Sequence, residues 1–270
     1  MVEPILRPED LRRWGEWMAE ALAWSKTSAH KRRVEMAKRD IEQALAAAPR
    51  WCVMSSGGKD STAMTHLVCT EMGLPIPVGS EKDDLDFPGE EEHLVHQAAQ
   101  YGWDLHILRP PVSPQQWLLE HREELHGNTN MHSRAAGLSK ACFYGVVEAF
   151  SEQYDGAFLG LRGEESKHRR KNRATHGKLY HKKAGQWVCT PLGDWRGIDV
   201  YAYCAARDIE LLPIYKCCAL MDSSDPSRVR KSWWVSTSQS HRGAAAWLRH
   251  YYPSLYARLA KIIPTVTRHA

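Results

Sequence analysis

Short apolar runs and amphipathic stretches alternate along the chain from residue 51 onward. The apolar runs predict four strands, at residues 51–55, 76–79, 104–108 and 156–160. The stretches between them carry apolar positions at helical spacing and predict helices at residues 60–72, 89–101, 114–124 and 139–153. Such alternation is typical of a mostly parallel sheet with helices on both faces. The predicted fold class is therefore α/β, a doubly wound mostly parallel sheet.

Helical patterns also flank this region. Residues 9–48 carry apolar positions at helical spacing, and Ser28 is the candidate cap of a second helix. Residues 179–189 predict a β-hairpin, residues 197–207 a helix, and residues 243–263 a helical tail. We therefore expect N- and C-terminal helical extensions around a central α/β domain. The expected divisions of the chain are 1–50, 51–216 and 217–270.

A polar loop with two glycines separates the first strand from the first helix of the α/β region. Its backbone amides can approach an anion closely because glycine has no side chain, and the helix start adds unpaired N–H donors. The serine hydroxyls can donate to phosphate oxygens, whereas an aspartate beside phosphates is expected to contact a divalent cation. The loop predicts a phosphate site, with Asp60 as the candidate Mg²⁺ ligand. Its residues are Ser56, Gly57, Gly58, Lys59, Asp60, Ser61 and Thr62.

A second polar motif, Arg162 to Ser166, follows the fourth predicted strand. Ligands bind beyond the carboxyl ends of parallel strands, so we expect this motif and the loop to face one crevice. Arg162 offers a planar fork for phosphate or sulfate, and Ser166 is a candidate donor to an anion. Glu164 and Glu165 have three open roles: holding Arg162, binding Mg²⁺, or capping. The basic run that follows is either a solvated surface or a site for an anionic second substrate, with candidates Lys167, Arg169, Arg170 and Arg173.

The string at residues 56–61 resembles the PP-loop of the ATP pyrophosphatase superfamily, whose members bind ATP and cleave it between the α- and β-phosphates. Residues 160–166 resemble the G-x-R-x-E-E-S segment of one branch of that superfamily. That branch contains phosphoadenosine phosphosulfate (PAPS) reductases, the small subunit of bacterial ATP sulfurylase, and DNA-phosphorothioation and phage relatives. Residues 190–201 and 212–215 resemble two further segments of the branch. The resemblance covers residues 51–216 and implies an adenine nucleotide α-hydrolase-like fold with ATP and Mg²⁺ as ligands.

The chain departs from this branch in the stretch after the second strand. Lys82 stands where the branch has the leading aspartate of a segment that contains Phe-Pro. Asp83, Asp84 and Asp86 are alternatives for the role of that aspartate, and Asp84 is the candidate metal ligand among them.

The seven cysteines form no C-x-x-C pair, and none follows Cys218. The reductases of the branch carry a catalytic cysteine in a C-terminal segment, which is missing here. We expect no iron–sulfur cluster, and we favour a buried role over a redox role for Cys217 and Cys218. Reduced thiols that serve core packing are expected at Cys52, Cys69, Cys142 and Cys204.

Composition excludes some classes of protein. No apolar run reaches the roughly 18 residues needed to span a membrane. The first residues lack the apolar segment of a secretory signal, so we expect a cytoplasmic protein without a membrane partner. The net charge of +4 does not by itself indicate nucleic acid. Homo-oligomerisation and a sulfur-transfer protein partner are open.

The leading hypothesis is an enzyme that attacks the α-phosphate of ATP, releases pyrophosphate and transfers the adenylyl group, in sulfur-related or nucleic-acid-modification metabolism. Lys59, Asp60 and Arg162 are its candidate catalytic residues. Replacing Ser61 or Asp60 by alanine is expected to abolish pyrophosphate release and to leave the fold intact. By resemblance, the second substrate is sulfate, a sulfonucleotide or a nucleic-acid phosphodiester.

Two alternatives compete with this hypothesis. One is thiol-dependent reduction of a sulfonucleotide through Cys217 or Cys218. The other is a nucleic-acid-binding module that uses nucleotide only as a switch, whose affinity would fall steeply with salt. Its candidate contacts are residues 167–173, Lys182, Lys183, Arg228 and Arg230, together with aromatic residues of the tail.

Overall fold

A six-stranded sheet forms the centre of the computed structural model, which describes residues 3–120, 145–182, 185–220, 229, 244–262 and 267. Its strands are β1 Trp51–Met54, β2 Val78–Glu81, β3 Leu105–Leu108, β4 Gly156–Leu159, β5 Leu179–His181 and β6 Trp187–Cys189. Their order is β3-β2-β1-β4-β6-β5, and all neighbours are parallel except the hairpin pair β5 and β6. The predicted strands and hairpin are therefore confirmed.

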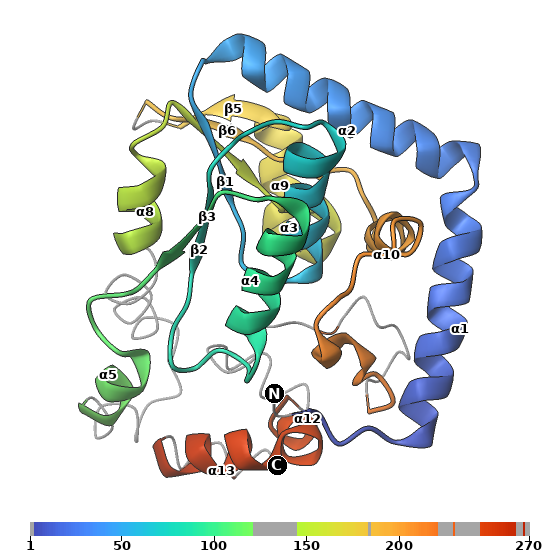
Figure 1. Ribbon diagram of the computed structural model, residues 1–270, viewed down its shortest axis with the longest axis vertical. Coiled ribbons are helices and arrows are strands. Elements are labelled where there is room, and N and C mark those ends of the chain that lie inside the picture. Colours follow the sequence, from blue (N-terminus) through green and yellow to red (C-terminus); the bar gives the residue numbers. More distant parts are fainter. Residues whose placement is uncertain are drawn as a thin grey trace.

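Helices cover both faces of the sheet, as the strand–helix alternation predicts. Helix α8 (Gly145–Ser151) packs against β1, β2 and β3. Figure 1 shows it on one side of the strands, with α3 (Lys59–Thr65), α4 (Glu90–Tyr101) and α10 (Gly197–Ala205) on the other. This arrangement confirms the α/β fold class. The remaining short elements of the central region are α5 Pro114–Glu120, η3 Gly163–Glu165, α9 Lys167–His176 and η4 Pro213–Lys216.

The helical extensions pack onto this central region. They are α1 Pro8–Ser25, α2 Ser28–Ala47, α12 Ala244–Tyr251 and α13 Pro253–Ile262. Helix α1 packs on α10, where Trp14 and Trp17 meet the ring of Tyr201 edge-on at 5.8 and 5.7 Å. The buried carboxylate of Asp10 accepts a hydrogen bond from the Tyr251 hydroxyl at 2.7 Å. One hydrophobic core therefore includes side chains from both extensions and from the central sheet.

Several boundaries differ from the predictions for local reasons. Strand β2 begins at Val78 rather than at residue 76, because Pro77 has no N–H for the ladder. The predicted helix 60–72 is α3 followed by a π-helical turn, η1 (His66–Glu71). The cap of α2 is Thr27, whose Oγ1 accepts a hydrogen bond from the His30 N–H at 3.2 Å, and not Ser28. The tail forms two helices, since α13 starts anew at Pro253.

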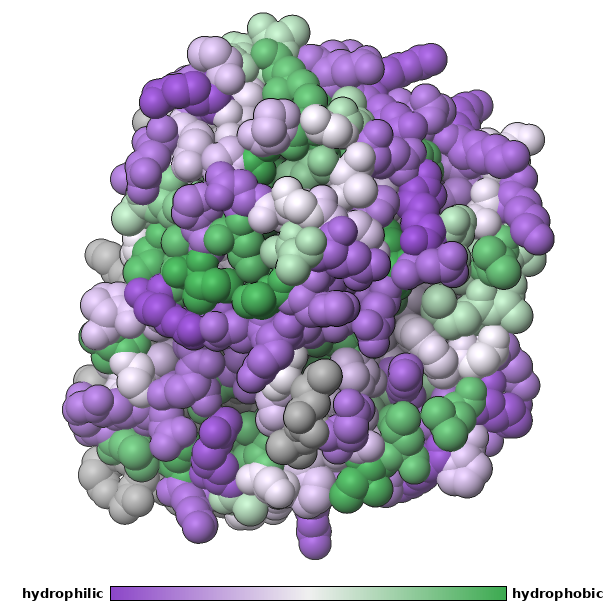
Figure 2. All heavy atoms as spheres, viewed as in Figure 1, coloured by the Kyte–Doolittle hydropathy of each residue, from purple (hydrophilic) through white to green (hydrophobic). Residues whose placement is uncertain are grey.

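Two predicted helices are seen only in part. Residues 121–124 of the third predicted helix and residues 139–144 of the fourth lie outside the described residues. Within the described ranges, no helix is both long enough and apolar enough to cross a membrane. In Figure 2 hydrophilic side chains cover much of the face that is viewed, and hydrophobic ones gather in separate patches.

Candidate active site

Hydrogen bonds among its own residues close the polar loop between β1 and α3. Ser61, in the first turn of α3, accepts a hydrogen bond from the Ser56 N–H at 3.2 Å and donates to the Gly58 carbonyl at 2.9 Å. The two serine hydroxyl oxygens lie 3.1 Å apart. Gly57 has a φ of +76°, a conformation that side chains rarely allow. The tight turn that the glycines predict is therefore present, with two hydroxyls side by side on it.

The loop also packs closely against the residue that follows β4. A Cβ added at Gly160 would lie 2.8 Å from the Cα of Ser61, so only glycine permits this approach. The approach brings the second polar motif next to the loop. Thr62 was predicted to bind phosphate, but its side chain is buried and its N–H donates to the Gly58 carbonyl at 2.9 Å. Thr62 is enclosed by protein in the first turn of α3, and its predicted phosphate contact stays a prediction.

Asp60 is the centre of a group of buried charges at the loop. Its Oδ1 accepts a hydrogen bond from Arg162 Nε at 2.6 Å, and its Oδ2 lies 3.1 Å from Lys59 Nζ. The side chains of Lys59 and Arg162 are only 4% and 3% exposed. Burial alone would raise the pKa of the Asp60 carboxyl, but the charges of Lys59 and Arg162 outweigh it and hold that pKa below its usual value. Both carboxylate oxygens thus face protein cations, unlike those of the metal ligand that the sequence predicts.

Two glutamates hold Arg162 in place. Glu164 accepts hydrogen bonds from Arg162 Nη1 at 2.9 Å and from the Gly197 N–H at 2.6 Å. Glu165 accepts from the Arg162 N–H at 2.9 Å. Burial would lower the pKa of the Arg162 guanidinium, but Asp60 and the two glutamates raise it above its usual value. Of the three roles left open for Glu164 and Glu165, the structure shows two: Glu164 holds the Arg162 guanidinium, and both glutamates accept a backbone N–H at a helix start.

Lys82 is a loop contact to which the sequence assigned no role. Its Nζ donates to the Ser56 carbonyl at 3.2 Å, lies 3.5 Å from Asp86 and forms an ion pair with Glu90. The side chain is 1% exposed, and a Cβ added at Gly57 would lie 3.6 Å from its Nζ. The ends of neighbouring parallel strands meet at one edge of the sheet. The position of a lysine just after β2 could therefore have predicted its contact with the loop after β1. Lys82 fixes the loop from inside the protein.

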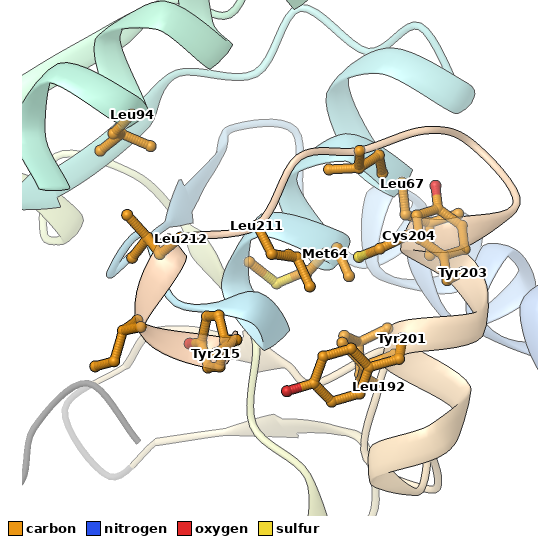
Figure 3. Close-up of a cluster of buried hydrophobic side chains, with 14 of the residues drawn as sticks. Met64, Leu67, Leu94, Leu192, Tyr201, Tyr203, Cys204, Leu211, Leu212 and Tyr215 are labelled. Carbon is orange, nitrogen blue, oxygen red and sulfur yellow. The ribbon is translucent and has the colours of Figure 1, made fainter. Parts of the chain in front are cut away.

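Tyr215, on η4, is a second site residue that sequence reasoning missed. Its hydroxyl accepts a hydrogen bond from the Lys59 N–H at 2.8 Å, and Lys59 Nζ lies 5.3 Å from its ring centroid. Figure 3 shows Tyr215 within the buried hydrophobic cluster that also holds Met64 of α3. The phenol thus satisfies one loop amide. Among the described residues, the amides of Gly57 and Gly58 make only long hydrogen bonds of 3.4 Å, to serine hydroxyls, which leaves them suited to an anion.

The second candidate metal ligand, Asp84, lies at the start of α5. Its side chain is exposed, and its carboxylate accepts hydrogen bonds from the Gln115 N–H at 3.1 Å and from the Ser113 hydroxyl. Asp86, rather than Asp84, is connected to the loop, through Lys82. Among the residues that the structure describes, no three His, Cys, Asp or Glu side chains gather as a metal-binding group. In this structure Asp84 contacts a helix start, and its predicted metal role stays a prediction.

The predicted basic run forms helix α9, and its cations fall into two groups. Arg169 forms an ion pair with Glu165, and Arg173 binds both oxygens of Asp194 at 3.0 and 2.9 Å. Ser166 accepts a hydrogen bond from the Arg169 N–H at 3.1 Å, so it caps α9, whereas the sequence predicted a donor to an anion. The exposed lysine and arginine side chains of the helix are Lys167, Arg170 and Lys171.

The cysteines of the described residues are free thiols. Cys217 and Cys218 are fully buried, and burial raises the pKa of Cys217 and raises that of Cys218 to about 11. A thiolate is the reactive form, so neither side chain is prepared for attack on a substrate. Cys52 and Cys204 are buried as predicted, Cys69 is half-buried against the core, and Cys142 lies outside the described residues.

The structure thus combines a mostly parallel sheet with a glycine–serine loop after β1 and a buried arginine after β4. Residues 50–218 match the family described as the phosphoadenosine phosphosulfate reductase domain, which is more than half of the chain. The chain belongs to this family. The motifs at residues 56–61 and 160–166, which the sequence analysis singled out, both fall inside the match.

Relatives among well-described proteins are distant. Subunit 2 of sulfate adenylyltransferase from Pectobacterium carotovorum is 26% identical over 187 residues, which cover 60% of this chain and 59% of that protein. The same subunit from Photobacterium profundum is 27% identical over 193 residues, with the same two shares covered. This chain thus spans 59% of the length of the relatives that it matches.

Solved structures with a similar fold come from several enzymes. FMN adenylyltransferase from Candida glabrata superposes with a TM-score of 0.50 at 11% identity, covering 77% of this chain and 67% of that one. PAPS reductase from Candida auris, in a phosphate complex, gives a TM-score of 0.49 at 16% identity, covering 65% of this chain and 81% of that one. At this level of identity, the likeness to the FMN adenylyltransferase shows the fold alone.

Proposed function

We propose that this chain binds ATP at the loop Ser56 to Ser61, cleaves the bond between the α- and β-phosphates, and transfers the adenylyl group to an anionic second substrate. The observation that carries the proposal is the convergence of three buried cations on one glycine–serine loop. Lys59, Lys82 and Arg162 are each at most 4% exposed, and each contacts the loop or its aspartate. Buried cations at a phosphate site stabilise the charge that develops as pyrophosphate leaves.

The residues divide the work between binding and reaction. The amides of Gly57 and Gly58 and the hydroxyls of Ser56 and Ser61 hold phosphate oxygens. An oxygen of the second substrate attacks the α-phosphorus, the bond from that phosphorus to the bridging oxygen of the β-phosphate breaks, and pyrophosphate leaves with the electron pair. Lys59 offsets the charge that builds on the leaving group. Positioning and electrostatic stabilisation then account for the catalysis.

Arg162 and Asp60 form the second part of the site. Asp60 keeps both Lys59 and Arg162 charged and fixed at the loop, at 3.1 and 2.6 Å. Arg162 holds the carboxyl end of β4 against the loop and keeps a buried positive charge beside the phosphates. Mg²⁺ usually binds through phosphates and one or two carboxylates. Both oxygens of Asp60 are engaged by cations, so the residues in place do not fit Mg²⁺ at Asp60, and we derive no step through the metal.

Thiol-dependent reduction is the less favoured reaction. It requires a reactive cysteine at the site, and the candidates Cys217 and Cys218 are buried with raised pKa values. The relatives named as a subunit of sulfate adenylyltransferase favour adenylyl transfer instead. The word subunit in their name also supports a partner chain for this protein. We propose that this protein and its partner act in the cytoplasm.

The test is product analysis with ATP labelled at the α-phosphate, with sulfate, a sulfonucleotide or an oligonucleotide as second substrate. We expect labelled AMP or an adenylylated product together with pyrophosphate. The variant Ser61→Ala should lose this release, because it removes the hydroxyl that closes the loop. Ser28→Ala, an exposed serine at the start of α2, is the matched control and should keep it. ADP with inorganic phosphate, or release unchanged in Ser61→Ala, would contradict the proposal.

A further inference from the structure

Helix α9 carries an exposed row of cations on one side. Lys167, Arg170 and Lys171 are all exposed, and so is Ala174. These positions are three and four residues apart, so they lie on one face of the helix. The helix contains five lysine and arginine residues and no aspartate or glutamate. We call the side formed by Lys167, Arg170 and Lys171 the outer face of α9.

Helix α9 carries no carboxylate of its own, unlike helix α1. Arg12 on α1 is also exposed, but it forms ion pairs with Glu9 and Glu16, both at 2.7 Å. Within α9 itself, Arg169 and Arg173 pair with carboxylates that anchor the helix. Among the described residues, the three cations of the outer face have no ion-pair partner. Their positive charge is therefore directed to solvent or to a ligand.

A chain of ion pairs and hydrogen bonds connects α9 to the loop. Asp60 binds Arg162 at 2.6 Å, the Arg162 N–H donates to Glu165 at 2.9 Å, and Glu165 pairs with Arg169. Ser166 begins α9 directly after this motif. A ligand on the outer face is thus held by an element that is anchored to the phosphate loop.

The chemistry of the outer face favours a polymer over a small anion. An exposed ion pair contributes about 0 to 1 kcal/mol, so single exposed cations hold sulfate weakly. The buried donor that could bind sulfate tightly, Arg162, is already bound to Asp60 and Glu164. A polyanion gains affinity from many contacts and from counterion release. Lys167 and Lys171 are about 6 Å apart along the helix axis, and each strand of a DNA duplex carries a phosphate about every 3.4 Å of duplex axis.

We propose that the outer face of α9 binds the phosphate backbone of a nucleic-acid strand and that this strand is the anionic second substrate. Its role as a substrate rests on the proposed function, whereas its binding does not. A membrane surface is disfavoured because α9 offers no apolar face to insert. The charge pattern contains no base-specific contact, so binding by backbone charge is expected to tolerate many sequences.

The test is fluorescence anisotropy of the full chain with labelled single-stranded DNA, single-stranded RNA and duplex DNA, without ATP and over a range of salt concentrations. The variant combines Lys167→Gln, Arg170→Gln and Lys171→Gln. The matched control combines Lys31→Gln, Arg32→Gln and Arg39→Gln, which removes the same charge from exposed positions of α2. We expect the α9 variant to bind about tenfold more weakly or worse, and its log–log salt slope to fall by about 2 for a single strand. The control should retain the wild-type slope.

The proposal would be overturned by no nucleic-acid binding in the wild type, or by an equal loss of binding in both variants. It would also be overturned if phosphatidylserine vesicles or polyglutamate bound as tightly as nucleic acid and depended equally on the outer face. Binding is also measured in Ser61→Ala, where it should persist. If wild-type binding holds and pyrophosphate release is never found, the proposed function fails while the docking surface stands. If release is found and binding is not, the docking surface alone fails.

Discussion

The loop and the outer face of α9 are both basic, but they differ in the burial of their cations and in the pairing of those cations with carboxylates. At the loop, Lys59 and Arg162 are buried, and Asp60 lies between them at 3.1 and 2.6 Å. On the outer face, Lys167 and Lys171 are exposed and pair with no carboxylate of the described residues. Water solvates an exposed cation, whereas a buried cation needs a partner to remain charged. Asp60 is therefore required at the loop for charge compensation as well as for any chemistry.

The largest effect is expected from Asp60→Ala. The sequence alone suggested that this variant keeps its fold, but the structure shows that it leaves two buried cations without their shared carboxylate. Breaking a buried pair in this way costs about 3–5 kcal/mol of the free energy of unfolding. Urea denaturation measures the loss. Ser61→Ala is therefore the cleaner variant for testing pyrophosphate release.

The matched control for this prediction is Asp194→Ala. Asp194 also pairs with two cations, Arg173 and Lys178, but its side chain is 45% exposed. Removing an exposed partner should cost about 1 kcal/mol or less. Equal losses in Asp60→Ala and Asp194→Ala would show that burial does not separate the two kinds of site.

The next largest effect is expected from acid, which should lower the free energy of unfolding through His66, a buried histidine that stays neutral in the folded protein. Burial first, and then the charge of Arg207, lower the pKa of His66 from 6.5 to about 4, although Glu71 opposes this. The unfolded chain binds the proton below pH 6.5, and the folded one does not until about pH 4. The stabilisation from His66 is therefore complete above pH 6.5 and is lost as the pH falls toward 4. It amounts to roughly 3 kcal/mol at most.

The measurement is urea denaturation of the wild type and of His66→Gln across this pH range. The difference between the two proteins isolates His66 from groups such as Asp83, whose pKa burial and Asp86 raise to about 6. The glutamine keeps a polar group beside the Tyr203 hydroxyl, which lies 3.0 Å from His66 Nδ1. A constant difference between pH 6.5 and 4 would contradict the prediction.

Lys82→Met tests the inner support of the loop. The substitution removes the donor to the Ser56 carbonyl, and a hydrogen bond to a charged group contributes about 1.5–3 kcal/mol. If the proposed function holds, KM for ATP should rise about 10- to 100-fold while kcat changes less. Steady-state kinetics of pyrophosphate release measures both constants.

The double variant Lys82→Met with Glu90→Gln separates two explanations. It removes the buried ion pair as a whole, so Glu90 is not left charged without Lys82. KM should stay high, because the Ser56 carbonyl still lacks its donor. A return of KM to the wild-type value would mean that Lys82 only balances Glu90.

The elements of the fold could be read from the sequence because their signals are local. Apolar runs of strand length, the two glycines of the loop and the hairpin pattern each lie within a few residues, and the structure confirms them. Lys82 and Tyr215 could not be assigned in this way. Lys82 reaches Ser56 across 26 positions, through the pairing of β1 with β2, and Tyr215 reaches Lys59 across 156.

Within the second motif, the residue types were predicted but not their partners. A sequence shows that Arg162 can bind an anion, and it does not show that Asp60 already supplies one. The same limit applies to Ser166, where capping and anion binding demand the same hydroxyl. Thr62 shows the converse case, since a hydroxyl beside a loop can still point into the protein. Three-dimensional packing decides between such uses.

The smallest effects separate the two groups of cations within α9. Arg173→Gln removes a two-point contact with Asp194, so it should lower the free energy of unfolding by up to about 1 kcal/mol. Lys171→Gln, two residues away on the opposite, exposed side of the helix, should change it by less than about 0.5 kcal/mol. Urea denaturation at matched salt compares the free energies of unfolding of the two variants. High salt should shrink the Arg173 effect, because exposed charges are screened. A larger loss for Lys171→Gln than for Arg173→Gln would mean that the outer face has a structural role, and the division drawn between anchoring and ligand-facing cations would then be wrong.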